Sequence, residues 1–274
     1  MIYWEMSMTP KYKQWSRREF LFRGFSGLIF LGTLDLTRPG SSSDFQAKNS
    51  FDLQPGQDIA KSLVDGIREN FIKALRQRLG MMFPGEEEKI CEEIKADDLA
   101  IIAGGQSWVT DTHAELHLML TSIVLATYRI LSQKIPYRET VLDITRYAFF
   151  EGQQHAAAKA QFLAMVEKEP DPFAMLVKVS KYKEENQYGK TFVFERERDD
   201  EKFYFLNVHK CFYHDFFSAH NAQDLTPVFC DWDDVWGDEL KDGRFGVKFE
   251  RPETLGYGAS MCRFQFSKTE RKKP

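Results

Sequence analysis

The densest group of reactive side chains in this sequence is the stretch CDWDDVW, which runs from Cys230 to Trp236. It places one thiol, three carboxylates and two indoles within seven residues. Because Asp is a preferred N-cap and acidic residues suit the first turn of a helix, a helix over residues 231–240 explains the carboxylates without any chemistry. A thiol beside a helix N-terminus can also have a lowered pKa and act as a nucleophile, although three neighbouring carboxylates oppose this. This stretch alone leaves both interpretations of Cys230 open.

Further polar residues lie close to the expected ends of strands in the second half of the chain. Asn207 lies near the end of one predicted strand, and Cys211 and His214 lie one turn apart at the start of the helix that follows. Cys262 lies inside the last predicted strand, after a turn that contains Gly258. A cysteine is often only a small buried apolar residue, but junctions between strands and helices commonly carry function. The positions of these residues therefore favour a pocket in the second half.

Histidines in the first half offer an alternative, metal-binding site. His113 and His117 are four residues apart on a predicted helix, so their side chains share one face. His155 could face them from the next long helix. Buried, hydrogen-bonded histidines at a helix end explain the same pattern, so a transition metal stays an alternative to the absence of a cofactor.

The N-terminus carries a targeting pattern. The hexapeptide SRREFL at residues 16–21 precedes a short Gly-rich apolar run at residues 24–34, which is too short to span a membrane by itself. This order resembles a twin-arginine signal of bacteria. We expect residues 1–36 to address the folded protein to the twin-arginine export machinery. The protein is then periplasmic or membrane-associated, with no stable transmembrane anchor after processing, and it is cytoplasmic if the signal is not used.

The bulk composition excludes several classes of protein. A formal net charge of −4 gives no general attraction to nucleic acid, so we expect no nucleic-acid partner. The four cysteines are widely spaced and form no CxxC pair, which argues against a disulfide scaffold or a zinc ribbon. The sequence contains no Gly-rich phosphate loop, no GxSxG and no HExxH.

Periodicity predicts an α+β fold. A Ser-, Gly- and Pro-rich linker at residues 37–57 leads into a single domain at residues 58–268, and a basic tail at residues 269–274 follows it. The domain has a helical N-terminal half, residues 58–169, packed on a mainly antiparallel sheet in residues 170–268. Apolar spacing predicts helices over residues 59–79, 85–95, 111–131 and 139–167. It predicts strands over residues 173–181, 191–196, 202–208, 247–251 and 260–266, with two short helices at 211–219 and 231–240.

Three spaced motifs carry a resemblance to a known family. They read NVxxCxY at residues 207–213, LTPVFCxxD at residues 225–233 and FERPxTLxxGxxxCxF at residues 249–264. Over about residues 110–268 the chain resembles the L-2-amino-thiazoline-4-carboxylic acid hydrolase family. The resemblance implies a hydrolase that cleaves a C–S or C–N bond of a small cyclic amidine. A nucleophile adds to the carbon between nitrogen and sulfur, and the thiolate leaves to give an N-carbamoyl cysteine.

The resemblance, carried over residue by residue, points to a pocket formed by Cys211, Cys230, Asp233 and Cys262. Chemistry suggests Cys230 as the nucleophile and Asp233, one turn later, as a base or as the group that binds the amidinium of the substrate. Repulsion between a carboxylate and a thiolate favours the second role for Asp233. His214 is the expected proton shuttle. Asn207, Cys262 and Gly258 are expected to bind the substrate.

The sequence leaves two other classes of function open. The first is an exported metal- or cofactor-binding redox protein that uses His113, His117 and His155 or the three late cysteines. The second is a non-catalytic module that binds a small molecule, in which the late cysteines are core residues or form one disulfide after export.

Overall fold

The computed structural model describes residues 54–234 and 236–272, with side chains from residue 61 onward. The predicted signal at residues 1–36 and most of the predicted linker lie outside the described residues. Helix α2 (Gln54–Met82) takes up the last four positions of that linker. At the other end, the last strand runs to Arg271, into the segment predicted to be a basic tail.

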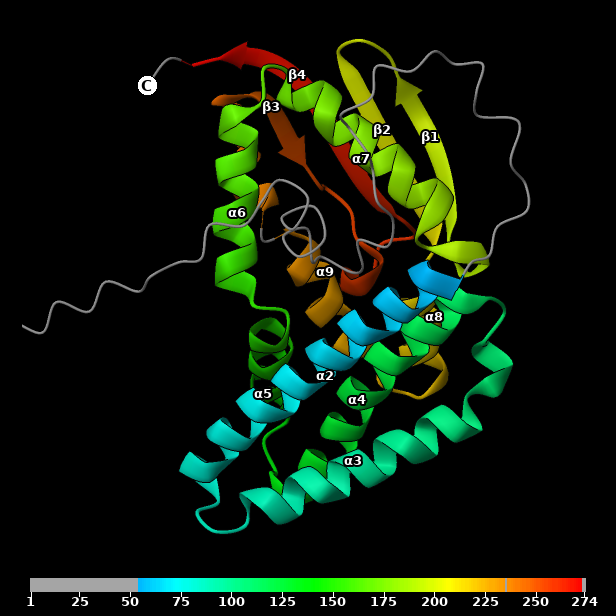
Figure 1. The fold of residues 1–274 in the computed structure, drawn as a ribbon, viewed down its shortest axis with the longest axis vertical. Helices are drawn as coiled ribbons and strands as arrows, with labels where there is room; N and C mark the ends of the chain where they lie inside the picture. The colour runs from blue at the N-terminus through cyan, green and yellow to red at the C-terminus, as the bar shows by residue number, and fades with distance from the viewer. Residues whose placement is uncertain (1–53, 235, 273–274) are drawn as a thin grey trace, which may run out of the picture.

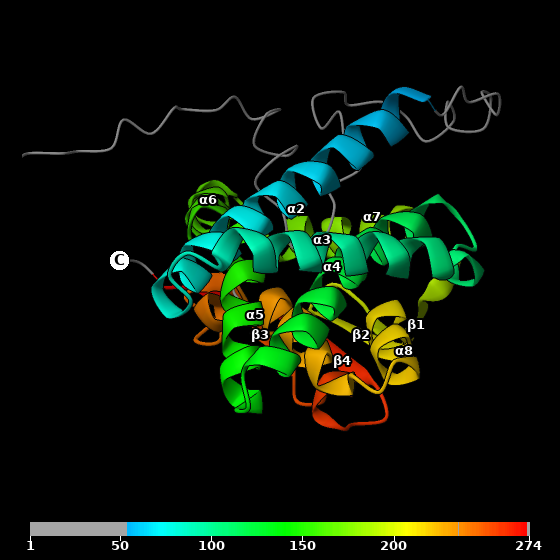
Figure 2. The same cartoon turned by 90° about the horizontal axis from the view of Figure 1, so that it is seen from below.

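The described chain has the predicted α+β architecture, with a helical first part and a four-stranded antiparallel sheet (Figure 1). The remaining helices are α3 (Glu87–Gly104), α4 (Thr112–Lys134), α5 (Arg138–Gly152), α6 (His155–Lys168), α7 (Pro172–Asn186), α8 (Phe212–Ala219) and α9 (Thr226–Asp234). The strands are β1 (Val193–Asp199), β2 (Phe203–Lys210), β3 (Phe245–Glu250) and β4 (Cys262–Arg271). Seen from below, α4 and α5 lie between the outer helices α2 and α3 and the C-terminal part of the chain (Figure 2).

The sheet has the strand order β1-β2-β4-β3, and every neighbouring pair is antiparallel. Alternate residues of a strand point to opposite faces, so one face of β2 is formed by Tyr204, Leu206 and Val208. Their partners on β4 include Phe264, opposite Leu206, and Cys262, opposite Val208. This apolar face turns toward α7, which packs on β3 and β4.

The prediction of a strand at residues 173–181 was wrong, because this segment is helix α7. Asp171 caps the helix by accepting a hydrogen bond from the Ala174 N–H at 3.0 Å, and Pro172 occupies the first turn. Phe173, Leu176 and Val179 are buried at helical spacing. The β-favouring residues of the segment misled the prediction, since capping and period outweigh intrinsic preference here. The helical part therefore runs to residue 186 and not to 169.

The prediction of one long helix over residues 139–167 was also wrong. Helices α5 and α6 are separated at Gln153 and Gln154, and Gln154 has a left-handed φ of 52°. Gly152 ends α5 where α5 crosses α2, and a Cβ at this position would lie 3.0 Å from the Phe71 side chain. Helix α5 thus ends where it lies close to α2. The spacing of apolar residues in the sequence cannot predict such a contact between helices.

Helix α4 is the centre of the helical part. Among the described helices it is the one that is long and apolar enough to cross a membrane. Of its most apolar window, 78% is buried inside the fold. Packing against α3, α5 and α8 accounts for this apolar character.

A buried ion pair ties the first three described helices together. Arg68 on α2 contacts the carboxylate of Asp98 on α3, with Nη1 3.3 Å from Oδ1. The Ser122 hydroxyl on α4 donates to the same Oδ1 at 2.6 Å. Asp98 is only 2% exposed, so its charge depends on these partners.

The buried apolar residues form two clusters. The larger cluster joins the helical part to α8, α9 and the Val208 and Cys262 end of the sheet. The smaller cluster joins α6 and α7 to the opposite end of the sheet, around Tyr204, Val247 and Phe266. The candidate site lies where these two clusters meet.

Candidate active site

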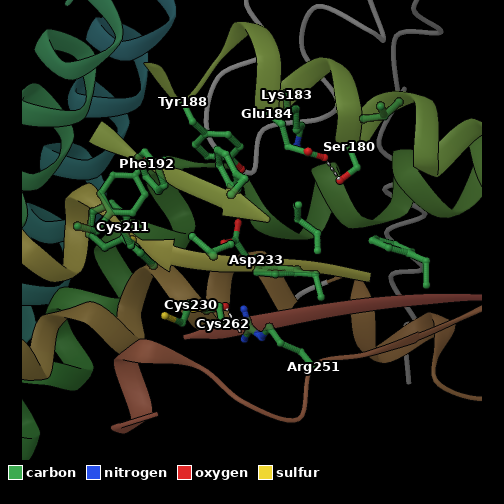
Figure 3. Close-up of a pocket in the computed structure, with 18 of the residues that line it drawn as sticks. Ser180, Lys183, Glu184, Tyr188, Phe192, Cys211, Cys230, Asp233, Arg251 and Cys262 are labelled. Atoms are coloured by element: carbon green, nitrogen blue, oxygen red, sulfur yellow. Dashed lines mark hydrogen bonds between the residues drawn. The ribbon is translucent and has the colours of Figure 1, made fainter. Parts of the chain in front are cut away.

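A cavity of about 110 Å³ lies between α7, α9 and the apolar face of the sheet (Figure 3). A space of this order accommodates a molecule the size of one small ring. Most of its wall is apolar, and the polar and ionisable residues that line it are Ser180, Lys183, Glu184, Tyr188, Cys211, Tyr213, Thr226, Cys230, Asp233, Arg251 and Cys262. In Figure 3, the α7 residues reach the cavity from one side, whereas Cys230, Cys262 and Arg251 lie on the other.

Helix α9 positions two of the predicted residues. The helix spans Thr226–Asp234 and has Pro227 in its first turn, so the predicted helix at residues 231–240 was wrong in its start and end. Cys230 lies in the middle of the helix, with Asp233 one turn later, and both face the cavity. The acidic run CDWDD thus ends a helix instead of beginning one, and Cys230 has no help from a helix N-terminus.

Three thiols line the same cavity, and all of them are free in the structure. Burial raises the pKa of Cys230 to about 12, and the neighbouring Cys262 adds to the rise while Arg251 opposes it. Burial also raises the pKa of Cys211 and of Cys262. Cys211 is the residue that stands at a helix start, as the N-cap of α8, where the N–H groups of His214 and Tyr213 oppose the rise. All three are therefore thiols at neutral pH before a ligand binds.

Asp233 is the ionisable carboxyl group at the centre of the cavity (Figure 3). Burial raises its pKa to about 6, while the positive charges of Arg251 and Lys183 oppose that rise. A carboxyl group with this pKa is mostly ionised at pH 7 but costly to bury. It is suited to bind a cationic group of a ligand.

Two cationic residues of the cavity were missed by the sequence analysis. Lys183 on α7 has a pKa lowered by burial, with Asp233 opposing the effect. Arg251 is the residue after β3; its side chain is only 4% exposed and donates from Nη2 to the Cys230 carbonyl oxygen at 2.8 Å. Lys183 was missed because residues 173–181 were predicted to form a strand, whereas they belong to the same helix as Lys183, α7. Arg251 lies inside the motif at residues 249–264, but its position in the sequence gives no indication that it contacts Cys230.

Glu184, the next residue on α7, is held by other side chains. Its carboxylate accepts hydrogen bonds from Arg196 Nε at 2.8 Å, from Ser180 Oγ at 3.3 Å and from the Tyr204 hydroxyl. Hydrogen bonds from these three donors occupy most of the acceptor sites of the Glu184 carboxylate. Glu184 is therefore a structural anion at the rim of the cavity.

Three of the predicted site residues are absent from the described lining of the cavity. Asn207 points to the other face of the sheet, where its amide donates to Glu197 at 2.9 Å. His214 lies on α8 beyond Cys211, which does line the cavity. Gly258 ends a 3-10 turn with a φ of 87°, and a Cβ there would meet nothing within 4 Å.

A comparison with known protein families identifies the family of this chain. A family model described as L-2-amino-thiazoline-4-carboxylic acid hydrolase matches residues 117–266. The chain belongs to this family. None of the curated proteins matches the chain significantly. A solved structure described as the Fe(II) unliganded H-NOX protein from K. algicida is similar at 12% identity, covering 75% of this chain and 96% of that one with a TM-score of 0.30.

The family match includes every polar residue that lines the cavity. The three cysteines and Asp233, which the resemblance indicated, come from the N-cap of α8, from α9 and from β4, and they line the same cavity. The cavity is therefore the candidate active site of this member of the L-2-amino-thiazoline-4-carboxylic acid hydrolase family.

The three histidines of the metal alternative do not come together. His117 is 1% exposed, its Nδ1 lies 2.8 Å from the Tyr213 hydroxyl, and burial lowers its pKa to about 3. His155 stacks on Phe150 at 5.0 Å between ring centroids. Within the described parts of the chain, no group of three or more His, Cys, Asp or Glu residues could hold a metal ion. The described residues thus do not fit the metal site that the histidine spacing suggested.

The raised pKa of Asp233 predicts a pH effect on stability. A carboxyl group with a native pKa of about 6 and an unfolded value of 3.8 stabilises the fold below pH 3.8, and this contribution is lost as the pH rises through about 6. We expect the free energy of unfolding of Asp233→Asn, relative to the wild type, to rise by about 2–3 kcal/mol between pH 4 and pH 7. Urea unfolding of both proteins at each pH measures this difference, and a constant difference would contradict the assignment.

Gly256 predicts an effect on the Cys230 thiol. A Cβ at Gly256 would lie 2.8 Å from Cys230 Sγ and 3.2 Å from the backbone N of Pro227. We therefore expect Gly256→Ala to displace the sulfur and to change the rate at which iodoacetamide alkylates Cys230 by about tenfold, since reactivity follows access. Gly104→Ala is the control, because a Cβ there meets nothing within 4 Å. Peptide mass spectrometry measures the rate, and equal rates in the two variants would place the sulfur elsewhere.

Proposed function

We propose that this protein hydrolyses a small cyclic amidine of the 2-amino-thiazoline-4-carboxylate type. The observation that carries the proposal is the position of Cys230 and Asp233, one turn apart on α9 and facing the same mainly apolar cavity. The family match over residues 117–266 supports the same class of reaction. Asp233 is the group that pairs with the amidinium, and Cys230 is the nucleophile.

The reacting form is the neutral amidine, which forms when the amidinium bound at Asp233 loses one proton to solvent. The Cys230 sulfur adds to the carbon between nitrogen and sulfur. At the same time the thiol proton passes to an amidine nitrogen, which acts as the base for this step. The ring C–S bond then breaks, and its electron pair leaves with the ring sulfur. The carbon is now an isothiouronium bonded to Cys230, and its positive charge pairs with Asp233.

Water completes the proposed reaction. Its oxygen adds to the isothiouronium carbon, the bond to Cys230 breaks, and the urea of an N-carbamoyl cysteine forms. The Cys230 sulfur recovers one proton, and the second proton neutralises the thiolate of the product. The substrate, one water molecule and the side chains of the protein supply every atom of these steps, and His214 is not required as a shuttle.

The test is turnover of L-2-amino-thiazoline-4-carboxylate by the full chain. We expect one new free thiol and one N-carbamoyl-L-cysteine for each substrate consumed, measured by thiol titration and mass spectrometry. Acid quenching during turnover should trap an adduct on the peptide that contains Cys230. Absence of a new thiol would refute the proposal.

A second candidate is a binding module without turnover. The raised pKa of all three thiols favours it, because a protonated thiol is a poor nucleophile. In this case calorimetry would detect binding of the same compound, with no product and no adduct.

We also propose that residues 1–36 act as a twin-arginine signal and deliver the folded protein to the periplasm. The support is the hexapeptide SRREFL followed by the short apolar run. A reporter fused after residue 36 should be exported from bacterial cells, and the double substitution Arg17→Lys and Arg18→Lys should stop it. Export that survives the double substitution would contradict the assignment.

A further inference from the structure

We propose that Arg251 binds the carboxylate of the substrate and so makes the site selective for rings that carry one. The inference rests on the proposed function and adds a specificity-determining residue to it. Asp233 accounts for the amidinium of such a substrate, but a zwitterion also needs a cationic partner. The residue that provides it decides how the ring is oriented toward Cys230.

Arg251 combines burial with an unused donor. Its side chain is 4% exposed and lines the cavity, and its guanidinium lies 5.5 Å from the centroid of Phe264, another lining residue (Figure 3). Both of its polar contacts with described residues use Nη2, which lies 2.8 Å from the Cys230 carbonyl oxygen and 3.2 Å from Asp234 Oδ2. The buried Nε–H has no acceptor among the described residues. A buried donor without a partner is costly, so an anion that accepts its hydrogen bond is favoured.

The contacts of Nη2 also hold the guanidinium in a fixed orientation. A planar guanidinium offers parallel N–H groups that match the two oxygens of a carboxylate, and a group already held in place loses little entropy on binding. Lys183 is the other cation of the wall, on α7 across the cavity. It is a point charge on a flexible stem and lacks this geometry.

The position of Arg251 fits the proposed chemistry. Its bond to the Cys230 carbonyl places a carboxylate bound there beside the turn of α9 that carries the nucleophile. Asp233 lies on the same helix one turn later. A ring held at its carboxylate by Arg251 and at its amidinium by Asp233 therefore presents the carbon between nitrogen and sulfur to the Cys230 thiol.

The experiment measures binding of two rings that lack the amidine, so its result does not depend on turnover. Isothermal titration calorimetry compares L-thiazolidine-4-carboxylate with thiazolidine. We expect the wild type to bind the carboxylate at least about tenfold more tightly, as a charge-assisted hydrogen bond in a buried site allows. Arg251→Gln should reduce this preference to about threefold or less, and Arg251→Lys should reduce it partly because lysine lacks the planar fork.

The control is Arg263→Gln on β4. Arg263 pairs with Glu253 at 3.2 Å on the other face of the sheet, so this variant should keep the full preference. If Arg251→Gln does not fold, Arg251→Lys gives the answer. The assignment is overturned if the wild type shows no preference, or if the preference stays at full strength in Arg251→Lys.

The outcomes separate this inference from the proposed function. A wild type that prefers the carboxylate but does not open 2-amino-thiazoline-4-carboxylate refutes the reaction and keeps the role of Arg251. A wild type that opens the ring but binds both thiazolidines equally keeps the reaction and refutes the role of Arg251.

Discussion

The variant Cys230→Ser is expected to hydrolyse L-2-amino-thiazoline-4-carboxylate at least about a thousandfold more slowly than the wild type, because loss of a nucleophile removes the covalent route. A serine hydroxyl is less acidic than the thiol and a weaker nucleophile, and no histidine lines the described cavity to activate it. The fold should survive, since the two side chains are similar in size. The measurements are kcat/KM by thiol release and the melting temperature by circular dichroism.

Matched cysteine variants make this prediction decisive. Cys91 is fully buried in the helical part and does not line the cavity, so Cys91→Ser should lower stability and leave turnover intact. Cys211→Ser and Cys262→Ser should retain part of the activity, because these thiols shape the wall of the cavity. Full activity in Cys230→Ser together with loss of activity in Cys211→Ser would show that the nucleophile is Cys211, at the N-cap of α8.

The variant Asp98→Asn is expected to lower the free energy of unfolding by about 3–5 kcal/mol, the cost of removing one partner of a buried ion pair. The substitution leaves the Arg68 side chain, which is 14% exposed, without a counter-charge, and it weakens the hydrogen bond from Ser122. Three helices lose a common anchor at once. Urea unfolding followed by circular dichroism measures the change.

Asp65→Asn is the control for this prediction. Asp65 lies on the same helix as Arg68 and pairs with Lys61 at 3.0 Å, but its side chain is 44% exposed. An exposed pair of this kind contributes about 0–1 kcal/mol. A loss in Asp98→Asn no greater than that in Asp65→Asn would show that the buried pair does not stabilise the helical part.

Much of the fold could be predicted from the sequence, and the errors have identifiable causes. The antiparallel strands and α8 were found because their apolar periods are clear. The prediction of a strand over α7 was wrong because the segment is rich in β-favouring residues, although Asp171 and Pro172 form a recognisable helix start. The break at Gln154 had only Gly152 as a signal, and a single glycine inside a helical pattern does not by itself end a helix.

The candidate site was only partly predictable for a related reason. Cys211, Cys230, Asp233 and Cys262 were named from spaced motifs, and the fold brings them to one cavity. The opposite wall comes from α7, and no rule of local spacing connects Lys183 to Asp233, fifty positions later. Local patterns identify the ends of elements, whereas the pairing of distant charges is a property of the packed structure.

The meeting of the two apolar clusters at the cavity has a thermodynamic consequence. Phe229 and Cys262 of the larger cluster and Leu176 and Phe266 of the smaller one contribute to the same wall. We expect the two clusters to open with different free energies in the free protein, and a molecule that fills the cavity contacts both of them. Binding should therefore slow amide hydrogen exchange in α7 and in α9 together, so that segments with separate protection in the free protein become one cooperative unit.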